Sequence, residues 1–290
     1  MPELPEVETT VRGLNEKVLE RTFVDVWTDW RKLIKKPKSF AEFREKIGNK
    51  KIKRVWRRGK NIIFELSDGL SLLIHQKMTG HLIYGVWEKR GVKWEPQNDG
   101  DLRDKVNTYI HLIFFLDNGK MLALSDLRKF AKAELWETEE LKKSEELKGL
   151  GPEPLEEGFT LEKFKDALRE KKGKIKQVLM DQTVIAGVGN IYSDEALWWA
   201  RINPFRPTNK LSEDELKKIY NAIKKVLKEG IRLGGESFSD YRNIEGKKGN
   251  FDDERKVYRR EGEKCPICSG LVVRKKIGGR SAHFCPSCQK

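Results

Sequence analysis

The sequence is poor in cysteine, with four in 290 residues, and it has no apolar run long enough to cross a bilayer. No signal-peptide pattern opens the chain, and neither an internal repeat nor a low-complexity tract is visible. These absences argue against an integral membrane protein and against a secreted protein held together by disulfides. We therefore expect a cytoplasmic protein.

Positive charge is in excess, because 59 Lys and Arg residues outnumber 45 Asp and Glu residues and leave a formal net charge of +14. A basic chain favours a polyanionic partner, for which nucleic acid is the first candidate and an anionic membrane surface the weaker one. Apolar residues make up 38% of the chain. This composition and length suit two domains, or one large domain with an appendage.

Hydrophobic periodicity divides the chain into a β-rich part and a helical part. Apolar residues recur at helical spacing from Val7 to Val18, and short strand-like runs follow between residues 52 and 136. The dipeptide Asn118-Gly119 between two such runs is a strong hairpin signal. We predict a β-sandwich or barrel here, with the charged segment 88–105 as a loop on its surface.

A composition shift to Glu and Lys begins at Thr138, and residues 149–154 have the Gly and Pro content of a hinge or linker. Beyond this segment the apolar period becomes helical. The longest predicted helix starts at Ser212, with Glu215 as its capping partner, and ends before Gly234-Gly235.

The cysteines form two CxxC pairs, Cys265 with Cys268 and Cys285 with Cys288. Two such pairs are typical of a closed tetrahedral zinc site. Two disulfides are the alternative, which the lack of a secretion signal disfavours. The segment between the pairs, with Gly278-Gly279 at its turn, predicts a β-hairpin that zinc would stabilise. Arg280 lies near the tip of the hairpin, and taken alone it is most simply interpreted as one more solvated cation in a basic tail.

The first residues, Met-Pro-Glu-Leu-Pro-Glu, can carry covalent chemistry. Removal of Met1, which the small Pro2 favours, leaves a secondary amine at the start of the chain. An α-amine has a pKa of about 8, against about 10.4 for lysine, so more of it is the uncharged nucleophile near neutral pH. Such an amine can attack a carbon electrophile and form an iminium, and Glu3 beside it can move protons. The alternative is that Pro and Glu only begin a helix.

Two glycine-containing turns have both a functional and an ordinary interpretation. Residues 186–192, Ala-Gly-Val-Gly-Asn-Ile-Tyr, lie between two predicted helices. The glycines let a ligand approach the backbone, and Asn190 can cap the next helix or donate to a phosphate. Lys60 lies in the cationic hairpin 57–61, which suits phosphate binding. An ordinary connection and a solvated turn are the alternatives.

Met78 and the run Arg128-Lys129-Phe130 combine a flexible apolar residue with a cation and an aromatic ring. Such side chains can fill the gap that an extruded base leaves in a duplex. As isolated residues, Met78 and Phe130 are equally suited to a hydrophobic core.

Together these segments resemble the formamidopyrimidine-DNA glycosylase family, bacterial enzymes that excise oxidised purines. The matching segments, in the family's order, are 1–9, 57–60, 78–80, 126–130, 151–155, 175–195 and 265–290. The resemblance implies an α+β, two-domain fold: an N-terminal β-sandwich with flanking helices, then a helix–two-turn–helix module and a four-cysteine β-hairpin zinc finger. The implied parts are a catalytic domain (1–136), a linker (137–154), the helical module (155–235), a lesion-recognition loop (236–254) and the zinc finger (255–290).

Carried over by position, the resemblance implies four catalytic residues. Pro2 attacks the sugar C1′ to form a Schiff base, and Glu3 handles protons at the sugar. Lys60 binds phosphate and donates a proton in β-elimination, and Arg280 grips the leaving phosphate and donates in δ-elimination. The implied DNA-binding residues are Met78, Tyr109, Arg128, Phe130, Lys171, Lys176 and Asn190. Those of the lesion pocket are Glu6, Glu195 and Tyr241, and one structural zinc is bound by Cys265, Cys268, Cys285 and Cys288.

The implied partner is double-stranded DNA with oxidised bases or abasic sites. The resemblance implies that the protein is a monomer, that it is associated with the nucleoid, and that it needs neither a membrane nor a small-molecule cofactor. Tyr109 stands where the family has a DNA-contacting histidine, and Gln76-Lys77 and Ala131 also depart from its pattern, so lesion preference stays open. One alternative is the endonuclease VIII type, which prefers oxidised pyrimidines, although Leu4 argues for the purine branch. The other is a non-catalytic zinc-containing protein that binds damaged DNA.

Overall fold

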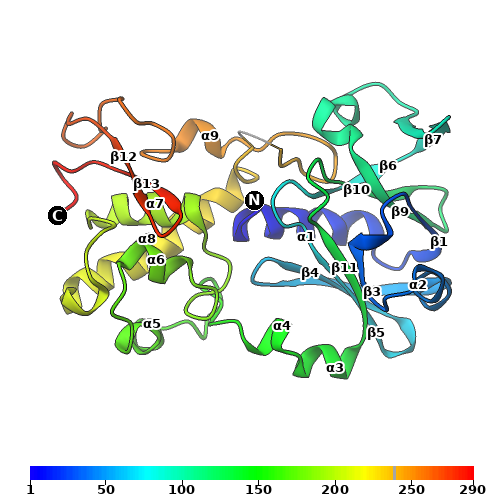
Figure 1. Cartoon of the computed structure of the whole chain (residues 1–290), viewed down its shortest axis with the longest axis horizontal. Coiled ribbons are helices and arrows are strands. Elements are labelled where there is room, and N and C mark those ends of the chain that lie inside the picture. Colours follow the sequence, from blue (N-terminus) through cyan, green and yellow to red (C-terminus); the bar gives the residue numbers. More distant parts are fainter. Residues whose placement is uncertain (238–239) are drawn as a thin grey trace. The chain divides into compact units, whose positions relative to one another are not determined.

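The chain forms two compact units, shown in the computed structural model of Figure 1, which describes residues 1–237 and 240–290. Unit 1 comprises Met1–Leu147 and Leu233–Asp252, and unit 2 comprises Lys148–Arg232 and Asp253–Lys290. Residues 238–239 of the predicted recognition loop lie outside the described residues. Among the described helices, none combines the length and the apolar character that crossing a membrane requires.

Unit 1 is built on a sheet of nine strands, counted over the described residues, in the order β2-β11-β5-β4-β3-β1-β9-β10-β6. These strands are β1 (Thr22–Thr28), β2 (Ile34–Lys36), β3 (Lys50–Arg58), β4 (Asn61–Leu66), β5 (Leu70–His75), β6 (His81–Gly85), β9 (Ile110–Leu116), β10 (Met121–Ser125) and β11 (Lys132–Glu137). A short pairing of β1 with β3, Thr22 opposite Lys51 and Phe23 opposite Lys50, joins two halves of the sheet.

The two halves enclose one hydrophobic core, so the predicted β-sandwich is confirmed. Phe23 of β1 has its ring centroid 6.2 Å from that of Phe64 on β4 and 5.0 Å from that of Phe114 on β9. All three side chains are fully buried. Burial of one such ring contributes about 1.5–3 kcal/mol to stability, so this contact between the halves is a main reason why the sheet folds over on itself.

Helix α1 (Leu4–Val18) packs on β3 of this sandwich, as the apolar spacing predicts. Asn15 Nδ2 donates to the Val55 carbonyl at 2.8 Å, and Arg57 Nε donates to the Glu8 carboxylate at 2.8 Å. Arg57 is nearer than Val55 to the turn after β3, and Glu8 is nearer than Asn15 to the start of α1. The first residues of the chain and the β3–β4 turn therefore lie at the same end of the sandwich.

Three shorter helices complete this part of the chain: α2 (Phe40–Ile47), α3 (Thr138–Lys143) and α4 (Glu145–Lys148). Leu141 and Leu147 are buried against the outward-facing Ile63 and Leu73 of the sheet. The short helices α3 and α4 thus occupy most of the Glu- and Lys-rich segment that begins the predicted linker, and they pack on one outer face of the sandwich.

The prediction of a loop at 88–105 is wrong in part. Strands β7 (Trp87–Arg90) and β8 (Lys93–Pro96) form a hairpin within and beside it. The hairpin folds back because Trp94 packs edge-on against Trp27 of the sheet, with ring centroids 5.4 Å apart. Charged residues alternate with these rings, so the segment is a half-buried hairpin whose polar face is exposed.

The segment Leu233–Asp252 belongs to unit 1 although it follows the helical part in sequence. Tyr84 N donates to the Ile244 carbonyl at 2.7 Å, and Ile244 is buried in the sandwich core. Gly13 of α1 lies so close that a Cβ there would come within 2.7 Å of the Ile244 side chain. Unit 1 is therefore completed by a segment that begins at Leu233, 86 residues after its first part ends at Leu147.

Unit 2 contains α5 (Leu161–Arg169), α6 (Ile175–Met180), α7 (Asn190–Ala200), α8 (Glu213–Arg232) and the end of α9 (Phe251–Glu254). The capping box predicted at the start of α8 is present. Ser212 N donates to Glu215 Oε2 at 2.8 Å, and Glu215 N donates to Ser212 Oγ at 3.3 Å. These helices confirm the helical module.

The C-terminal segment of unit 2 contains the antiparallel hairpin of β12 (Val273–Ile277) and β13 (Arg280–Phe284). Gly278 and Gly279 form its turn with φ of 53° and 74°, a backbone conformation that glycine adopts without strain. The predicted hairpin and its turn are confirmed, and Arg280 is exposed directly after the turn.

Candidate active site and DNA-contact residues

The start of α1 gathers the predicted catalytic and lesion-pocket residues of unit 1. Glu3 is the N-cap of the helix and only 2% exposed, and its backbone N–H donates to Glu6 Oε2 at 2.7 Å. Glu6 Oε1 accepts from the backbone N–H of Glu236 at 2.8 Å, and the Tyr241 hydroxyl donates to the Glu6 carbonyl at 3.0 Å. Burial raises the pKa of Tyr241, so it remains a neutral donor. Glu6 thus ties the segment 233–252 to the residues that follow Pro2.

The turn between β3 and β4 holds Lys60, which is only 7% exposed. His75, at the end of β5, lies opposite Asn61 in the strand register and is therefore a neighbour of this turn. Burial, together with the positive charges of Lys77, Lys132 and Lys60, lowers the pKa of His75 to about 3. Its Nδ1 accepts from the Lys77 backbone N–H at 2.9 Å, which leaves the proton on Nε2. His75 is a neutral N–H donor close to Lys60.

A cavity of about 440 Å³ in unit 1 joins the N-terminus to the predicted void-filling residues. It is lined by Met1, Trp30, Lys32, Lys35, Lys77, Met78, Lys129, Phe130 and Ala131. Met1 is thus part of the wall of a basic, aromatic cavity that Met78 and Phe130 share. Pro2 follows Met1 in the chain and is buried.

The buried carboxylate of Asp126 holds the two void-filling loops together. Thr79 Oγ1, next to Met78, donates to Asp126 Oδ1, and Ala131 N donates to Asp126 Oδ2 at 2.8 Å. Arg128 N donates to Asp126 Oδ1 at 3.2 Å. The backbone N–H of Asp126 donates to the Tyr109 carbonyl at 2.8 Å. Asp126 thus brings the segments of Met78, Tyr109, Arg128 and Phe130 to one place.

Exposure of the Arg128 and Phe130 side chains suits contact with DNA. Phe130 is 51% exposed, and the Arg128 guanidinium lies 4.7 Å from its ring centroid. A large exposed apolar ring stacked on a cation is suited to contact with bases rather than to a protein core. The core alternative for Phe130 is therefore wrong in this structure.

In unit 2, Asn190 is the first residue of α7 and does not cap it, because Gly189 is the N-cap residue and Asn190 Oδ1 has no hydrogen-bond partner among the described residues. The preceding turn is held by Gln182, whose Nε2 donates to the Val188 carbonyl at 2.7 Å and whose Oε1 accepts from Gly187 N at 2.9 Å. Gly187 has φ of 86°, which disfavours any other residue. The capping alternative for Asn190 is excluded, and its amide remains suited to a phosphate.

The other predicted residues of unit 2 have different surroundings. Lys171 is partly exposed, with Nζ 3.9 Å from Asp181. Lys176 is fully buried, with Nζ 2.5 Å from the Asp194 carboxylate. Glu195 is buried and accepts from the backbone N–H groups of Lys256, Val257 and Tyr258 at 2.8–3.0 Å. Burial raises the pKa of Glu195, and the three donors oppose that rise.

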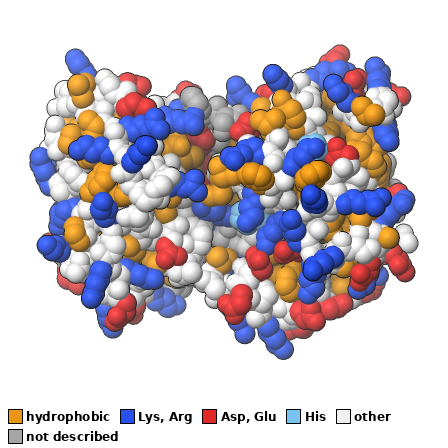
Figure 2. All heavy atoms as spheres, viewed as in Figure 1, with side chains coloured by type: hydrophobic (Ala, Val, Ile, Leu, Met, Phe, Trp, Pro, Cys, Tyr) orange, Lys and Arg blue, Asp and Glu red, His pale blue; other side chains and the backbone are white. Residues whose placement is uncertain are grey.

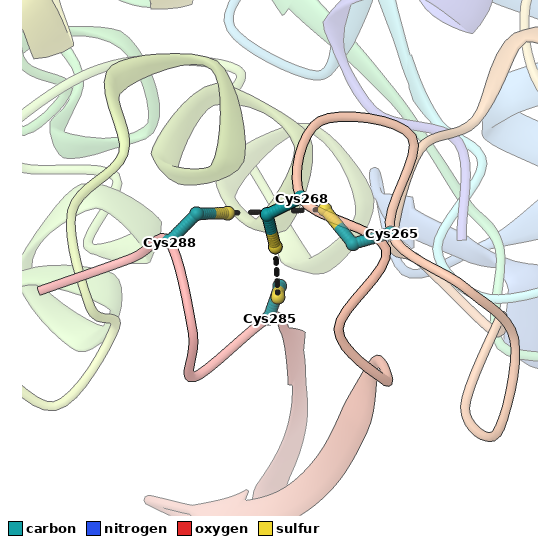
Figure 3. A group of neighbouring side chains, drawn as sticks. All are labelled: Cys265, Cys268, Cys285 and Cys288. Atoms are coloured by element: carbon teal, nitrogen blue, oxygen red, sulfur yellow. Dashed lines mark hydrogen bonds between the residues drawn. The ribbon is translucent and has the colours of Figure 1, made fainter.

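The four cysteines converge on one point, with their sulfur atoms all within 4.8 Å of one another (Figure 3). The Sγ atoms of Cys265 and Cys288 are 3.8 Å apart, and those of Cys268 and Cys285 are 3.4 Å apart. Tetrahedral zinc with Zn–S bonds of about 2.3 Å needs sulfurs about 3.8 Å apart. None of the four is in a disulfide. The donor set fits one structural zinc, which stabilises the β12–β13 hairpin, and the disulfide alternative is wrong.

Two residues that sequence reasoning missed are His75 and Asp126. Asp126 is the first residue of the matching segment 126–130, and His75 stands three residues before Met78; these positions are the signal that could have found them. Their roles depend on contacts between strands, however, and no local pattern shows these. Lys and Arg side chains also cover much of the face shown in Figure 2, as the net charge of +14 leads one to expect.

Comparisons with known proteins match every part of the chain. Three family models match: the formamidopyrimidine-DNA glycosylase N-terminal domain (residues 1–133), the H2TH domain of the same glycosylase (150–242), and the zinc finger found in FPG and IleRS (262–290). Among curated relatives, the formamidopyrimidine-DNA glycosylase of Pelotomaculum thermopropionicum is 43% identical over 292 residues, covering 100% of this chain and 99% of the relative. That of Desulfitobacterium hafniense is 40% identical, with 100% of both chains covered.

Solved structures show the same likeness. The wild-type Lactococcus lactis Fpg in complex with a DNA containing N7-benzyl-Fapy-dG is 34% identical, with a TM-score of 0.87 and 100% of both chains covered. The Lactococcus lactis Fpg in complex with a DNA containing an abasic site is 33% identical, with a TM-score of 0.87 and 99% of both chains covered. The chain belongs to the formamidopyrimidine-DNA glycosylase family, DNA glycosylases of base excision repair.

Proposed function

We propose that the chain is a bifunctional enzyme that excises oxidised purines, 8-oxoguanine and formamidopyrimidines, and then cleaves the strand as an abasic-site lyase. The observation that carries the proposal is the place of Pro2, directly after Met1, which lines the cavity of Met78 and Phe130. The substrate class is supported by the Lactococcus lactis relatives, which are bound to DNA with a Fapy-dG lesion or an abasic site.

The chemistry starts at the amine of Pro2 after Met1 has been removed. Its lone pair attacks C1′ of the damaged nucleotide, and the bond from C1′ to the base breaks with its electron pair leaving on the base, which takes up a proton. Opening of the sugar ring leaves an iminium between the Pro2 nitrogen and C1′. Glu3, buried beside Pro2, moves protons at the sugar.

Strand cleavage follows from the iminium, which withdraws electrons and makes the C2′ proton acidic. Loss of that proton expels the 3′ phosphate, and a second elimination expels the 5′ phosphate. We assign Lys60 to phosphate binding and to proton donation in the first elimination, and Arg280 to the phosphate that leaves in the second. Met78, Arg128 and Phe130 occupy the vacated stack, and Tyr109, Lys171 and Asn190 contact the DNA. The enzyme acts as a monomer at the nucleoid.

Borohydride reduction tests the proposal, because it converts the iminium into a stable amine. We expect the wild-type chain to be trapped on a duplex with an oxidised purine, and mass spectrometry to map the sugar to Pro2. Pro2→Gly should lose trapping almost completely. Pro5→Ala is the matched control, since Pro5 also lies at the start of α1 but offers no amine, and it should trap like the wild type.

Each contrary result has a defined meaning. An adduct on a side chain, or full activity of material that retains Met1, would refute Pro2 as the nucleophile. Trapping that is stronger on oxidised pyrimidines would favour the endonuclease VIII type. Binding to damaged duplex without any trapping would favour a non-catalytic damage-binding protein.

A further inference from the structure

The buried lysine of unit 2 bonds to three acceptors on two elements, helix α7 and strand β13. Lys176 lies on α6 and has no exposed side-chain surface. Its Nζ donates to Asp194 Oδ1 at 2.5 Å, to the Ser281 carbonyl at 2.8 Å and to the Asn190 carbonyl at 3.4 Å. One ammonium therefore joins the first residue of α7, the next turn of α7 and strand β13.

Asp194 continues this connection into the hairpin. Its Oδ2 accepts from the backbone N–H of His283 at 2.9 Å, and His283 Nδ1 lies 3.2 Å from the same oxygen. The carboxylate is as fully buried as its lysine partner. Both oxygens of Asp194 are thus used, one toward Lys176 and one toward β13, in the strand that begins with Arg280.

Further residues of α7 hold the rest of the zinc-binding segment. The Glu195 carboxylate accepts from three backbone N–H groups at Lys256, Val257 and Tyr258. The Trp198 indole N–H donates to Cys265 Sγ at 3.3 Å. Helix α7 therefore begins with Asn190, and residues further along the same helix bind the hairpin that contains Arg280 and the segment around it.

We propose that Lys176 and Asp194 are positioning residues that set the distance and direction between Asn190 and Arg280, so that both side chains can grip phosphates of one DNA strand. Neither of the two touches DNA. The proposal rests on the DNA-contact roles assigned above to Asn190 and Arg280, and it replaces the DNA contact that the resemblance implies for Lys176. A buried ion pair adds little net stability, but it can select one geometry. In this protein the selected geometry is the position of Asn190 relative to Arg280.

Binding of a duplex with a tetrahydrofuran abasic-site analogue tests the proposal without any chemical step. Lys176→Met should weaken binding by about ten- to hundredfold, the range of a hydrogen bond to a charged group. Removal of Lys176 alone leaves the Asp194 carboxylate buried without its ammonium partner, so Lys176→Met/Asp194→Leu is the second variant. It should recover part of the unfolding midpoint that Lys176→Met loses, because the buried charge is gone although the His283 N–H loses its acceptor, and it should keep the wild-type zinc content while its binding remains weak. Lys172→Met, which removes an exposed lysine of the same unit, is the matched control and should bind within about twofold of wild type.

A double-mutant cycle with Arg280→Ala gives the decisive comparison. If Lys176 acts through Arg280, adding Lys176→Met to the Arg280→Ala variant should weaken its binding of the duplex by less than about twofold. If the loss of binding in the double variant equals the product of the losses in the two single variants, the residues act independently and the proposal is refuted. So would a Lys176→Met defect seen only on a duplex carrying 8-oxoguanine, because that pattern requires contact with the base. Failure of borohydride trapping would refute the proposed chemistry and leave this binding test unaffected.

Discussion

The neutral state of His75 predicts a specific pH dependence of stability. In the folded chain, burial and three neighbouring lysines lower the pKa of His75 to about 3, whereas an unfolded histidine titrates near 6.5. Between these values the unfolded state binds one proton more than the folded state, so the free energy of unfolding rises with pH. At about 1.4 kcal/mol per pKa unit, acidification from pH 7 to pH 5 should remove about 2 kcal/mol through this residue.

His75→Gln isolates this contribution. A glutamine amide can still accept from the Lys77 N–H and still present an N–H group, but it does not titrate. Urea denaturation at pH 7 and pH 5 should show that the wild type loses about 2 kcal/mol more than the variant.

Equal losses in the wild type and in His75→Gln would refute the assignment, because a histidine that protonates alike in both states contributes no pH dependence. A larger loss in the variant would show the opposite sign and would imply that His75 is charged in the folded chain.

Two further predictions concern contacts that hold the site. Thr79→Val removes the hydroxyl that donates to the buried Asp126, so the free energy of unfolding should fall by about 1.5–3 kcal/mol. Thr79→Ser keeps the hydroxyl and should stay near the wild type. The same loss in both variants would show that the methyl group of Thr79 matters instead of its hydroxyl. Gly235→Ala places a Cβ 2.9 Å from Glu6 Cγ at φ of 88°. It should therefore destabilise more than Gly69→Ala, because Gly69 has φ of 71° and a Cβ there would meet no atom of the described residues within 4 Å. Equal thermal shifts would show that backbone strain alone decides.

Local signals predicted much of the fold. The Ser212–Glu215 capping box, the Asn118-Gly119 turn and the CxxC pairs each depend on residues close together in sequence, and the structure contains each of them. The hairpin of β7 and β8 was missed because its order depends on Trp94 packing against Trp27, a residue 67 positions earlier. Charge alone suggested a solvated loop.

The candidate site was predicted by residue type but not by environment. The family resemblance implies contact with DNA for Lys176, yet in the structure Lys176 is buried against Asp194, 18 positions away. Glu195 likewise binds backbone N–H groups more than 60 positions away. Such pairings depend on the packed fold, and the sequence around each residue does not show them.

The return of Leu233–Asp252 to unit 1 has a consequence for synthesis on the ribosome. The sandwich core includes Ile244, so this unit is not fully packed when residue 147 leaves the exit tunnel. At about 5–20 residues per second, the missing segment follows on the order of ten seconds later. During that interval the nascent sandwich has an uncovered apolar site beside Gly13, and a fragment that ends at residue 147 would keep it permanently. Neither unit is thus a module that can be transplanted as one continuous stretch of gene.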